Sequence, residues 1–229
     1  MTKVKFVVAS RVREAEFYEK TATGRSLRLY NFPFVDVHLF PENAEGLPKL
    51  YNSVIERSTN DPCVLIFAHD DLHIVDYYWA DQTIRGLAQF QILGIVGNTR
   101  RVPRQPSWAF VDDAFTWDAQ KHFSGVIGTG TGFPPRHLGV CGPSGVQVKL
   151  LDGLFLAAHS TTFIDNVLRF DERFDFNFYD LDLCRQAEQK NISCGTWPLS
   201  LIHESSGADS YKSEAWRKAY AAYLEKWGD

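Results

Sequence analysis

The sequence lacks the features that would tie it to a membrane, a repeat architecture or nucleic acid. Its longest apolar stretches, such as LLDGLFLAA at 150–158, contain an acid and fall well short of the roughly 20 apolar residues of a membrane-spanning helix. The N-terminal stretch MTKVKFVVAS has too short an apolar run for a signal peptide and instead predicts a first strand. No segment repeats at a fixed period. Lys and Arg number 24 against 28 Asp and Glu, so we expect no nucleic-acid partner and no integral membrane segment.

Cysteine is scarce, and the few cysteines lack the CxxC spacing of a metal or redox site. They lie in apolar or turn contexts at Cys63, Cys141, Cys184 and Cys194. Buried, reduced thiols are a better prediction for them than disulfides or a zinc site. This usage indicates a reducing compartment, and we therefore expect a cytoplasmic location.

The length of 229 residues allows one large domain or two small ones. A chain of this size buries a core without needing a disulfide or a structural metal. No stretch has the composition of a linker between domains. The sequence therefore predicts a single domain over residues 1–229.

The first hundred residues alternate between strand-like and helix-like patterns. Between the strands, Leu47, Leu50, Tyr51, Val54 and Ile55 follow helical spacing and give one apolar face. This alternation predicts an α/β fold, with a Rossmann-like mixed, mostly parallel sheet flanked by helices. The expected strands are Val4–Ala9, Phe34–Phe40, Cys63–Ala68 and Ile92–Val96.

The second half of the chain is less regular. Residues 103–143 are rich in Pro and Gly and predict a long loop system, which in a compact domain is usually functional. Regular patterns then return. We expect a strand or strand pair at Val146–Ala158, a helix at Tyr179–Lys190, a strand at Leu199–His203 and an amphipathic helix at Ser213–Trp227.

The run His69-Asp70-Asp71-Leu72-His73 directly follows an apolar strand. Ligands of open α/β sheets bind at the carboxyl ends of strands. Asp71 and His73, two residues apart on an extended turn, would point the same way and could share a divalent cation. The alternative is a polar turn in which an aspartate caps the next helix.

Two further acidic or histidine motifs are open to a structural and a functional interpretation. Asp180 and Asp182 begin a predicted helix, where they are either capping carboxylates or include a general base. His203 leaves a short apolar strand and is either a hydrogen-bonded structural residue or a third metal ligand. Trp108 either packs in the core or offers a surface on which a sugar stacks.

In this order, the motifs resemble family 2-type glycosyltransferases of the GT-A fold, within the nucleotide-diphospho-sugar transferase superfamily. The nearest resemblance is to small bacterial glycosyltransferase-like proteins, and it spans roughly residues 1–205. It rests on Asn43-x-x-Gly46-Leu47, Tyr51-Asn52-x-x-Ile55, CVLIFAHDDLH, and the later run from LLDGLFLAA to LRFDERFDFNFYDLDLCRQAE.

The resemblance implies roles for individual residues. Asp71 would be the acid of the family's DxD motif that meets the metal, His73 would stand for the second acid, and His203 would complete the site. Asp180 would be the catalytic base of an inverting transfer. The implied cofactor is Mn²⁺ or Mg²⁺.

The resemblance also implies where the substrates bind. Residues 1–100 would form the nucleotide-sugar half, 101–205 the acceptor-side half, and 206–229 a C-terminal helix. The donor is a nucleotide-diphosphate sugar and the acceptor a hydroxyl compound, and a homo-oligomer is compatible with this prediction. Implied donor contacts are Ser10, Arg11, Asn43 and Asp70, and implied acceptor or donor-sugar contacts are Asp152, Gly153 and Trp108.

The sequence thus predicts a metal-dependent glycosyltransferase. Two alternatives stay open. Clusters of His and Asp at strand ends also activate water, which is typical of metal-dependent hydrolases. A non-catalytic protein of the same fold that binds a sugar or a nucleotide is the other alternative.

Overall fold

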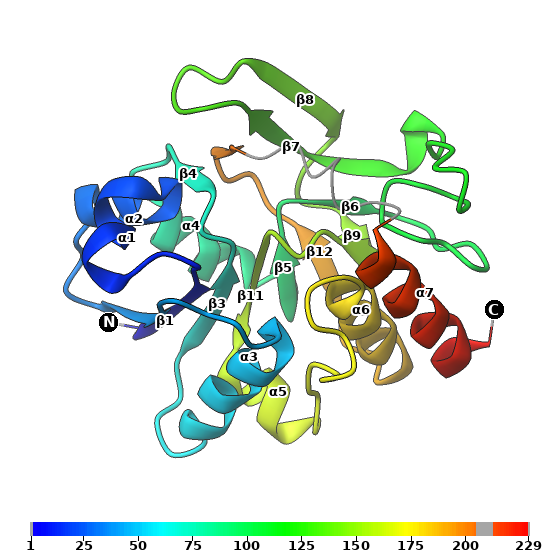
Figure 1. The fold of residues 1–229 in the computed structure, drawn as a ribbon, viewed down its shortest axis with the longest axis horizontal. Coiled ribbons are helices and arrows are strands. Elements are labelled where there is room, and N and C mark those ends of the chain that lie inside the picture. Colours follow the sequence, from blue (N-terminus) through cyan, green and yellow to red (C-terminus); the bar gives the residue numbers. More distant parts are fainter. Residues whose placement is uncertain (1, 205–212, 229) are drawn as a thin grey trace.

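The computed structural model describes residues 2–204 and 213–228 of the chain. Residues 205–212, which include the start of the segment 206–229 assigned above to a C-terminal helix, lie outside the described residues. The architecture is a seven-stranded mixed sheet with helices on both faces and a second, six-stranded sheet beside it (Figure 1). This confirms the predicted α/β fold class.

The large sheet has the order β2-β1-β3-β11-β5-β12-β9. Among the first three strands of the chain, β1 pairs in parallel with both β2 and β3, as crossover connections through helices require. In the centre β11 runs antiparallel to β3 and β5, while β12 returns parallel to β5. The strands are β1 (Val4–Ala9), β2 (Val35–Phe40), β3 (Val64–Ala68), β5 (Ile92–Gly94), β9 (Gln147–Val148), β11 (Phe155–His159) and β12 (Cys194–Thr196).

Each face of this sheet is covered by helices, which explains why β3 is apolar without a break and β1 is apolar apart from Lys5. In β1, Val7 belongs to the core on one face, while Phe6 and Val8 belong to the core on the other. The first core packs α3 (Leu47–Arg57), α5 (Ser160–Asp165), α6 (Tyr179–Gln189) and α7 (Glu214–Trp227). The second packs α1 (Glu14–Lys20), α2 (Ala22–Leu29) and α4 (Trp79–Gly86).

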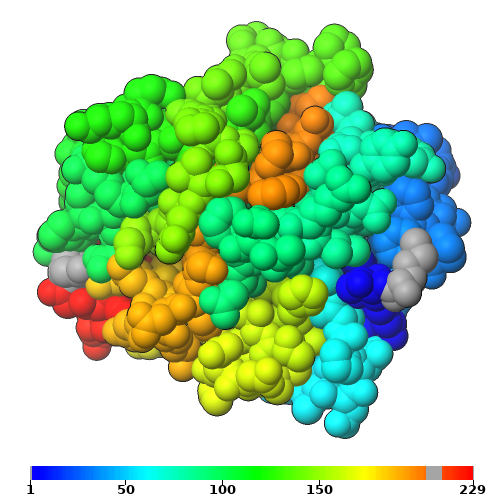
Figure 2. All heavy atoms as spheres, turned by 180° about the vertical axis from the view of Figure 1, so that it is seen from behind, coloured from blue at the N-terminus to red at the C-terminus, as the bar shows by residue number. Residues whose placement is uncertain are grey.

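The second sheet has the order β10-β6-β7-β13-β4, and β8 pairs with β7. Its strands are β4 (Leu72–Ile74), β6 (Val96–Asn98), β7 (Phe123–Thr129), β8 (His137–Gly142), β10 (Leu150–Leu151) and β13 (Leu201–His203). Seen from behind, the orange segment that contains β12 and β13 lies between the teal segment around α4 and the green segments of the second sheet (Figure 2). The two halves of the chain therefore meet around β13.

The prediction of a continuous loop over 103–143 is wrong, because this stretch contains η1 (Gln120–His122) and the antiparallel pair β7–β8. The glycines that suggested a loop allow close contact between strands. A Cβ on Gly125 would lie 2.0 Å from the Ile95 carbonyl oxygen, and one on Gly142 would lie 2.2 Å from that of Phe123. Glycine in a strand marks such close backbone approach.

The C-terminal amphipathic helix is present, as α7. The Ser213 side chain accepts a hydrogen bond from the backbone N–H of Trp216 at 3.1 Å, and Gly228 ends the helix at φ 71°. Among the helices described, all are too short or too polar to cross a bilayer.

Candidate active site

A cleft of about 860 Å³ opens at the carboxyl ends of β1 and β3. Ser10 and Arg11 follow β1, and Asp70 follows β3. Because β1 and β3 are parallel neighbours, their ends meet at one edge of the sheet. The four residues predicted to contact the donor, Ser10, Arg11, Asn43 and Asp70, all line this cleft.

The floor of the cleft is held by its own polar groups. The Ser10 hydroxyl donates a hydrogen bond to the Asp70 carboxylate. The backbone N–H of Asn43 donates to the Ser10 carbonyl at 2.8 Å, and the Asn43 side chain accepts from the N–H of Glu45 at 3.0 Å. Arg11 is exposed at the cleft. The cleft therefore has a preformed floor and an available guanidinium.

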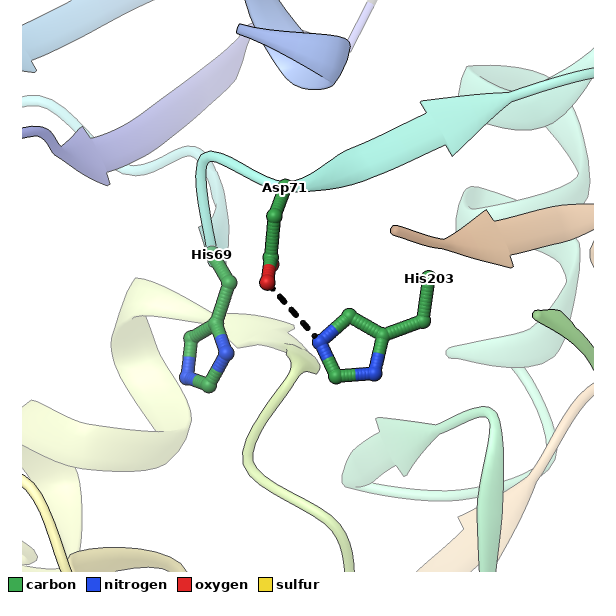
Figure 3. A group of neighbouring side chains, drawn as sticks. All are labelled: His69, Asp71 and His203. Atoms are coloured by element: carbon green, nitrogen blue, oxygen red, sulfur yellow. Dashed lines mark ion pairs between the residues drawn. The ribbon is translucent and has the colours of Figure 1, made fainter. Parts of the chain in front are cut away.

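Next to the cleft, His69, Asp71 and His203 form a group that could hold a metal ion (Figure 3). One ligand atom from each residue lies within 4.8 Å of those of the others. Antiparallel pairing of β4 with β13 sets His203 opposite Leu72, next to Asp71. The Asp71 Oδ2 atom lies 3.1 Å from His203 Nε2.

The two histidines of this group differ in their electrostatics. Burial lowers the pKa of His69, so its ring is neutral and offers a lone pair. Burial also opposes the charged form of His203, but its hydrogen bond to Asp71 and the charges of Asp71 and Asp152 outweigh burial and raise its pKa. Two imidazole nitrogens with one carboxylate oxygen suit first-row divalent ions such as Mn²⁺.

The structure does not bring His73 into this group. Its Nε2 atom lies 3.6 Å from the Glu204 carboxylate, which is itself 2.7 Å from Arg25. The expectation that Asp71 and His73 point the same way is not met, because Asp71 lies in the turn before β4 and the alternation of an extended strand does not apply to it.

Sequence reasoning missed His69, which takes the place intended for His73. The signal was present, because His69 directly follows the buried strand β3 and stands two residues before Asp71. A small cavity of about 100 Å³ is lined by His69 and Asp71 and shares Asp70 and Phe176 with the large cleft. The Phe176 ring stacks on His69, with centroids 5.3 Å apart. The cavity beside His69 and Asp71 therefore adjoins the cleft.

The two aspartates at the start of α6 have different surroundings. Asp182 is fully buried, and it accepts from the Trp227 indole at 2.9 Å and pairs with Lys226 at 2.6 Å. Its role is to hold α7 against α6. Asp180 accepts the backbone N–H of Gly153 at 2.9 Å. Burial and the nearby charge of Asp152 raise the pKa of Asp180 to about 7.

The charge of Asp152 acts on both the metal-ligand group and Asp180, since it raises the pKa of His203 and of Asp180. The Trp108 indole donates to Asp152 at 2.6 Å, so this half-buried ring orients a carboxylate. Gly153 is buried, and a Cβ there would lie 2.4 Å from the Tyr179 hydroxyl. Gly153 therefore serves close packing under the site.

Neither a protein-family model nor a curated protein matches the sequence. The structure is similar to that of GalNAc-T7 with UDP, GalNAc and Mn²⁺, with a TM-score of 0.57 and 11% identity over 98% of this chain. It is also similar to the catalytic domain of Drosophila β1,4-galactosyltransferase 7 in complex with xylobiose, with a TM-score of 0.51 and 9% identity over 96% of this chain and 80% of that one. This chain spans 48% of the GalNAc-T7 chain, about half its length. The likeness shows a GT-A fold.

Proposed function

We propose that the protein is a metal-dependent glycosyltransferase that moves a sugar from a nucleoside-diphosphate donor to an acceptor hydroxyl. The observation that carries this proposal is the position of His69, Asp71 and His203 beside a cleft of about 860 Å³ at the strand ends of a GT-A fold. GalNAc-T7, which has the same fold, was crystallised with UDP and Mn²⁺.

In this proposal His69, Asp71 and His203 hold the metal ion, and the cleft lined by Ser10, Arg11, Asn43 and Asp70 holds the nucleotide. A bound divalent cation supplies electrostatic stabilisation for the negative charge of a leaving diphosphate. The nitrogen-containing ligand set favours Mn²⁺ over Mg²⁺.

Asp180 is the proposed general base. The acceptor oxygen bonds to the anomeric carbon as the bond from that carbon to the diphosphate breaks, and the hydroxyl proton passes to Asp180. A carboxylate whose pKa is about 7 is well matched to this task near neutral pH. Direct attack in one step inverts the anomeric configuration. The free cysteines support a reducing, cytoplasmic location as part of the proposal.

The test is titration calorimetry of the protein with UDP, GDP, ADP and CDP, with and without Mn²⁺. We expect one nucleoside diphosphate to bind at least about 10-fold more tightly with Mn²⁺, because metal and diphosphate are bound together. His203→Ala should abolish this effect of Mn²⁺ on nucleotide binding. His73→Ala is the matched control and should leave the effect unchanged. If Mn²⁺ strengthens the binding of none of these nucleotides, the proposal is wrong. Hydrolysis of a phosphoester without any acceptor would instead favour a metal-dependent hydrolase.

A further inference from the structure

Tyr179 lies between the metal-ligand group and Asp180, and the proposed function gives it no role. We propose that Tyr179 is a positioning residue whose hydroxyl holds His69 in the Nε2–H tautomer, so that the metal ligand of His69 is Nδ1. This inference rests on the proposed function, because it concerns the metal site of that function.

The direction of the hydrogen bonds follows from what each group is able to do. The Tyr179 hydroxyl lies 2.9 Å from the Gly153 carbonyl oxygen, which only accepts. In that contact the hydroxyl is the donor, and we therefore assign its single proton to Gly153. An ordinary phenol is protonated near neutral pH, so the hydroxyl carries this proton. What remains on the hydroxyl oxygen is a lone pair.

That lone pair faces His69, whose Nε2 atom is 3.0 Å away. With the hydroxyl proton on Gly153, the contact is a hydrogen bond only if Nε2 carries the proton of the imidazole. A neutral imidazole has one proton, so Nδ1 is then bare. Figure 3 shows that one ring nitrogen of His69 points toward Asp71 and His203. Because Nε2 is bonded to Tyr179, that nitrogen is Nδ1, and it presents a lone pair to a metal.

In the opposite tautomer, Nδ1 of His69 would carry the proton and point an N–H at the metal-ligand group. The group would then have two ligand atoms in place of three. Metal-binding histidines commonly donate their second ring N–H to a fixed acceptor, which sets both the tautomer and the ring orientation. Here the acceptor is a phenol hydroxyl. Its position is fixed because Tyr179 is 2% exposed and packs against Tyr51 and Phe170, each with ring centroids 6.0 Å away.

The same contacts connect the metal-ligand group to the proposed base. Tyr179 binds the carbonyl of Gly153, and the next residue, Asp180, accepts the N–H of Gly153. A side chain at Gly153 would displace the Tyr179 hydroxyl, since its Cβ would lie 2.4 Å from that atom. Consecutive residues of α6 therefore hold one glycine, and through it His69 and Asp180 are positioned together.

The first test uses the wild-type protein without metal. Long-range ¹H–¹⁵N NMR of the imidazole rings distinguishes the two tautomers, and a His69→Gln variant assigns the signals of His69. We expect His69 to be protonated on Nε2. A His69 that carries its proton on Nδ1 would overturn the proposal. This measurement needs neither metal nor activity, so it stands even if a variant at position 179 folds poorly.

The second test compares Tyr179→Phe with Tyr220→Phe by Mn²⁺ calorimetry and by the same NMR measurement. Tyr220 is a matched control, because its hydroxyl is also bonded to a main-chain carbonyl, that of Arg104, at 2.6 Å. We expect Tyr179→Phe to weaken Mn²⁺ binding about 10- to 100-fold and to populate both tautomers of His69. Tyr220→Phe should change neither.

Two outcomes separate this inference from the proposed function. Equal Mn²⁺ affinity and an unchanged His69 tautomer in Tyr179→Phe would overturn the role of Tyr179 and leave the proposed function standing. Absence of Mn²⁺ binding in the wild type would remove the metal site and with it the proposed function, while the nitrogen shifts still decide whether Tyr179 selects the tautomer.

Discussion

Two pairs of histidine and carboxylate lie at one end of the β4–β13 ladder, where His203 is opposite Leu72. Asp71 and His203 join His69 at the cleft. His73 and Glu204 lie together elsewhere, and there Glu204 also pairs with Arg25 at 2.7 Å.

The difference between the pairs lies in their surroundings. Glu204 is neutralised by an arginine from α2, so its pair needs no further ion. Near Asp71 the structure instead adds a second histidine, His69. The charge of Asp152 also raises the pKa of His203 and of Asp180. Residue types alone do not distinguish the two pairs. They differ in their third member, which is Arg25 beside Glu204 and His69 beside Asp71.

The largest expected effect concerns Asp180, the proposed general base. Asp180→Asn should lower the rate of transfer about 10²- to 10⁴-fold, because a general base is lost while the shape is kept. With a pKa of about 7, Asp180 is active in its ionised form, so the wild-type rate should rise as pH increases through about 7. Initial rates of sugar transfer between pH 5 and 9 test this, with unchanged Mn²⁺ binding as the control. If Asp180→Asn transfers sugar at the wild-type rate, Asp180 is not the general base.

The second prediction compares the two pairs directly. Asp71→Asn should weaken Mn²⁺ binding at least about 100-fold, more than the loss of a typical outer partner, because a charged ligand is removed. Glu204→Gln is the matched change on the other pair and should alter Mn²⁺ affinity less than about 3-fold, since Glu204 lies outside the metal-ligand group. Calorimetry with Mn²⁺ measures both. Equal losses in the two variants would show that the pairs act as one site.

The smallest expected effect is on stability. Arg25→Met removes the cation that pairs with Glu204, and the Arg25 side chain is 36% exposed. Partly exposed ion pairs of this kind contribute roughly 0–1 kcal/mol to the free energy of unfolding. Urea denaturation should therefore show a loss of at most about 1 kcal/mol. A much larger loss would mean that the His73–Glu204 pair holds the β4–β13 ladder in place.

Much of the fold was predictable where periodicity is strong. Both β1 and β3 are buried on both faces; β3 is a continuous apolar run and β1 is apolar apart from Lys5. The helices α3 and α6 show helical spacing. The β7–β8 pair was missed because Gly125 and Gly142 are required there by close backbone contact with Ile95 and Phe123, and such contacts between distant segments leave no local pattern.

In the candidate site, too, some residues were predictable from local patterns and others were not. The sequence alone indicated Asp71, His203 and Asp180, because each stands at the end of a strand or the start of a helix, where parallel strands and helix ends bring polar groups together. Only the tertiary structure replaced His73 by His69, assigned Asp182 to packing and connected Tyr179 to His69. Local periodicity determines which elements form and which edge of the sheet carries polar groups. Which side chains meet there depends on turns and on partners distant in sequence, so it is decided only when the chain is folded.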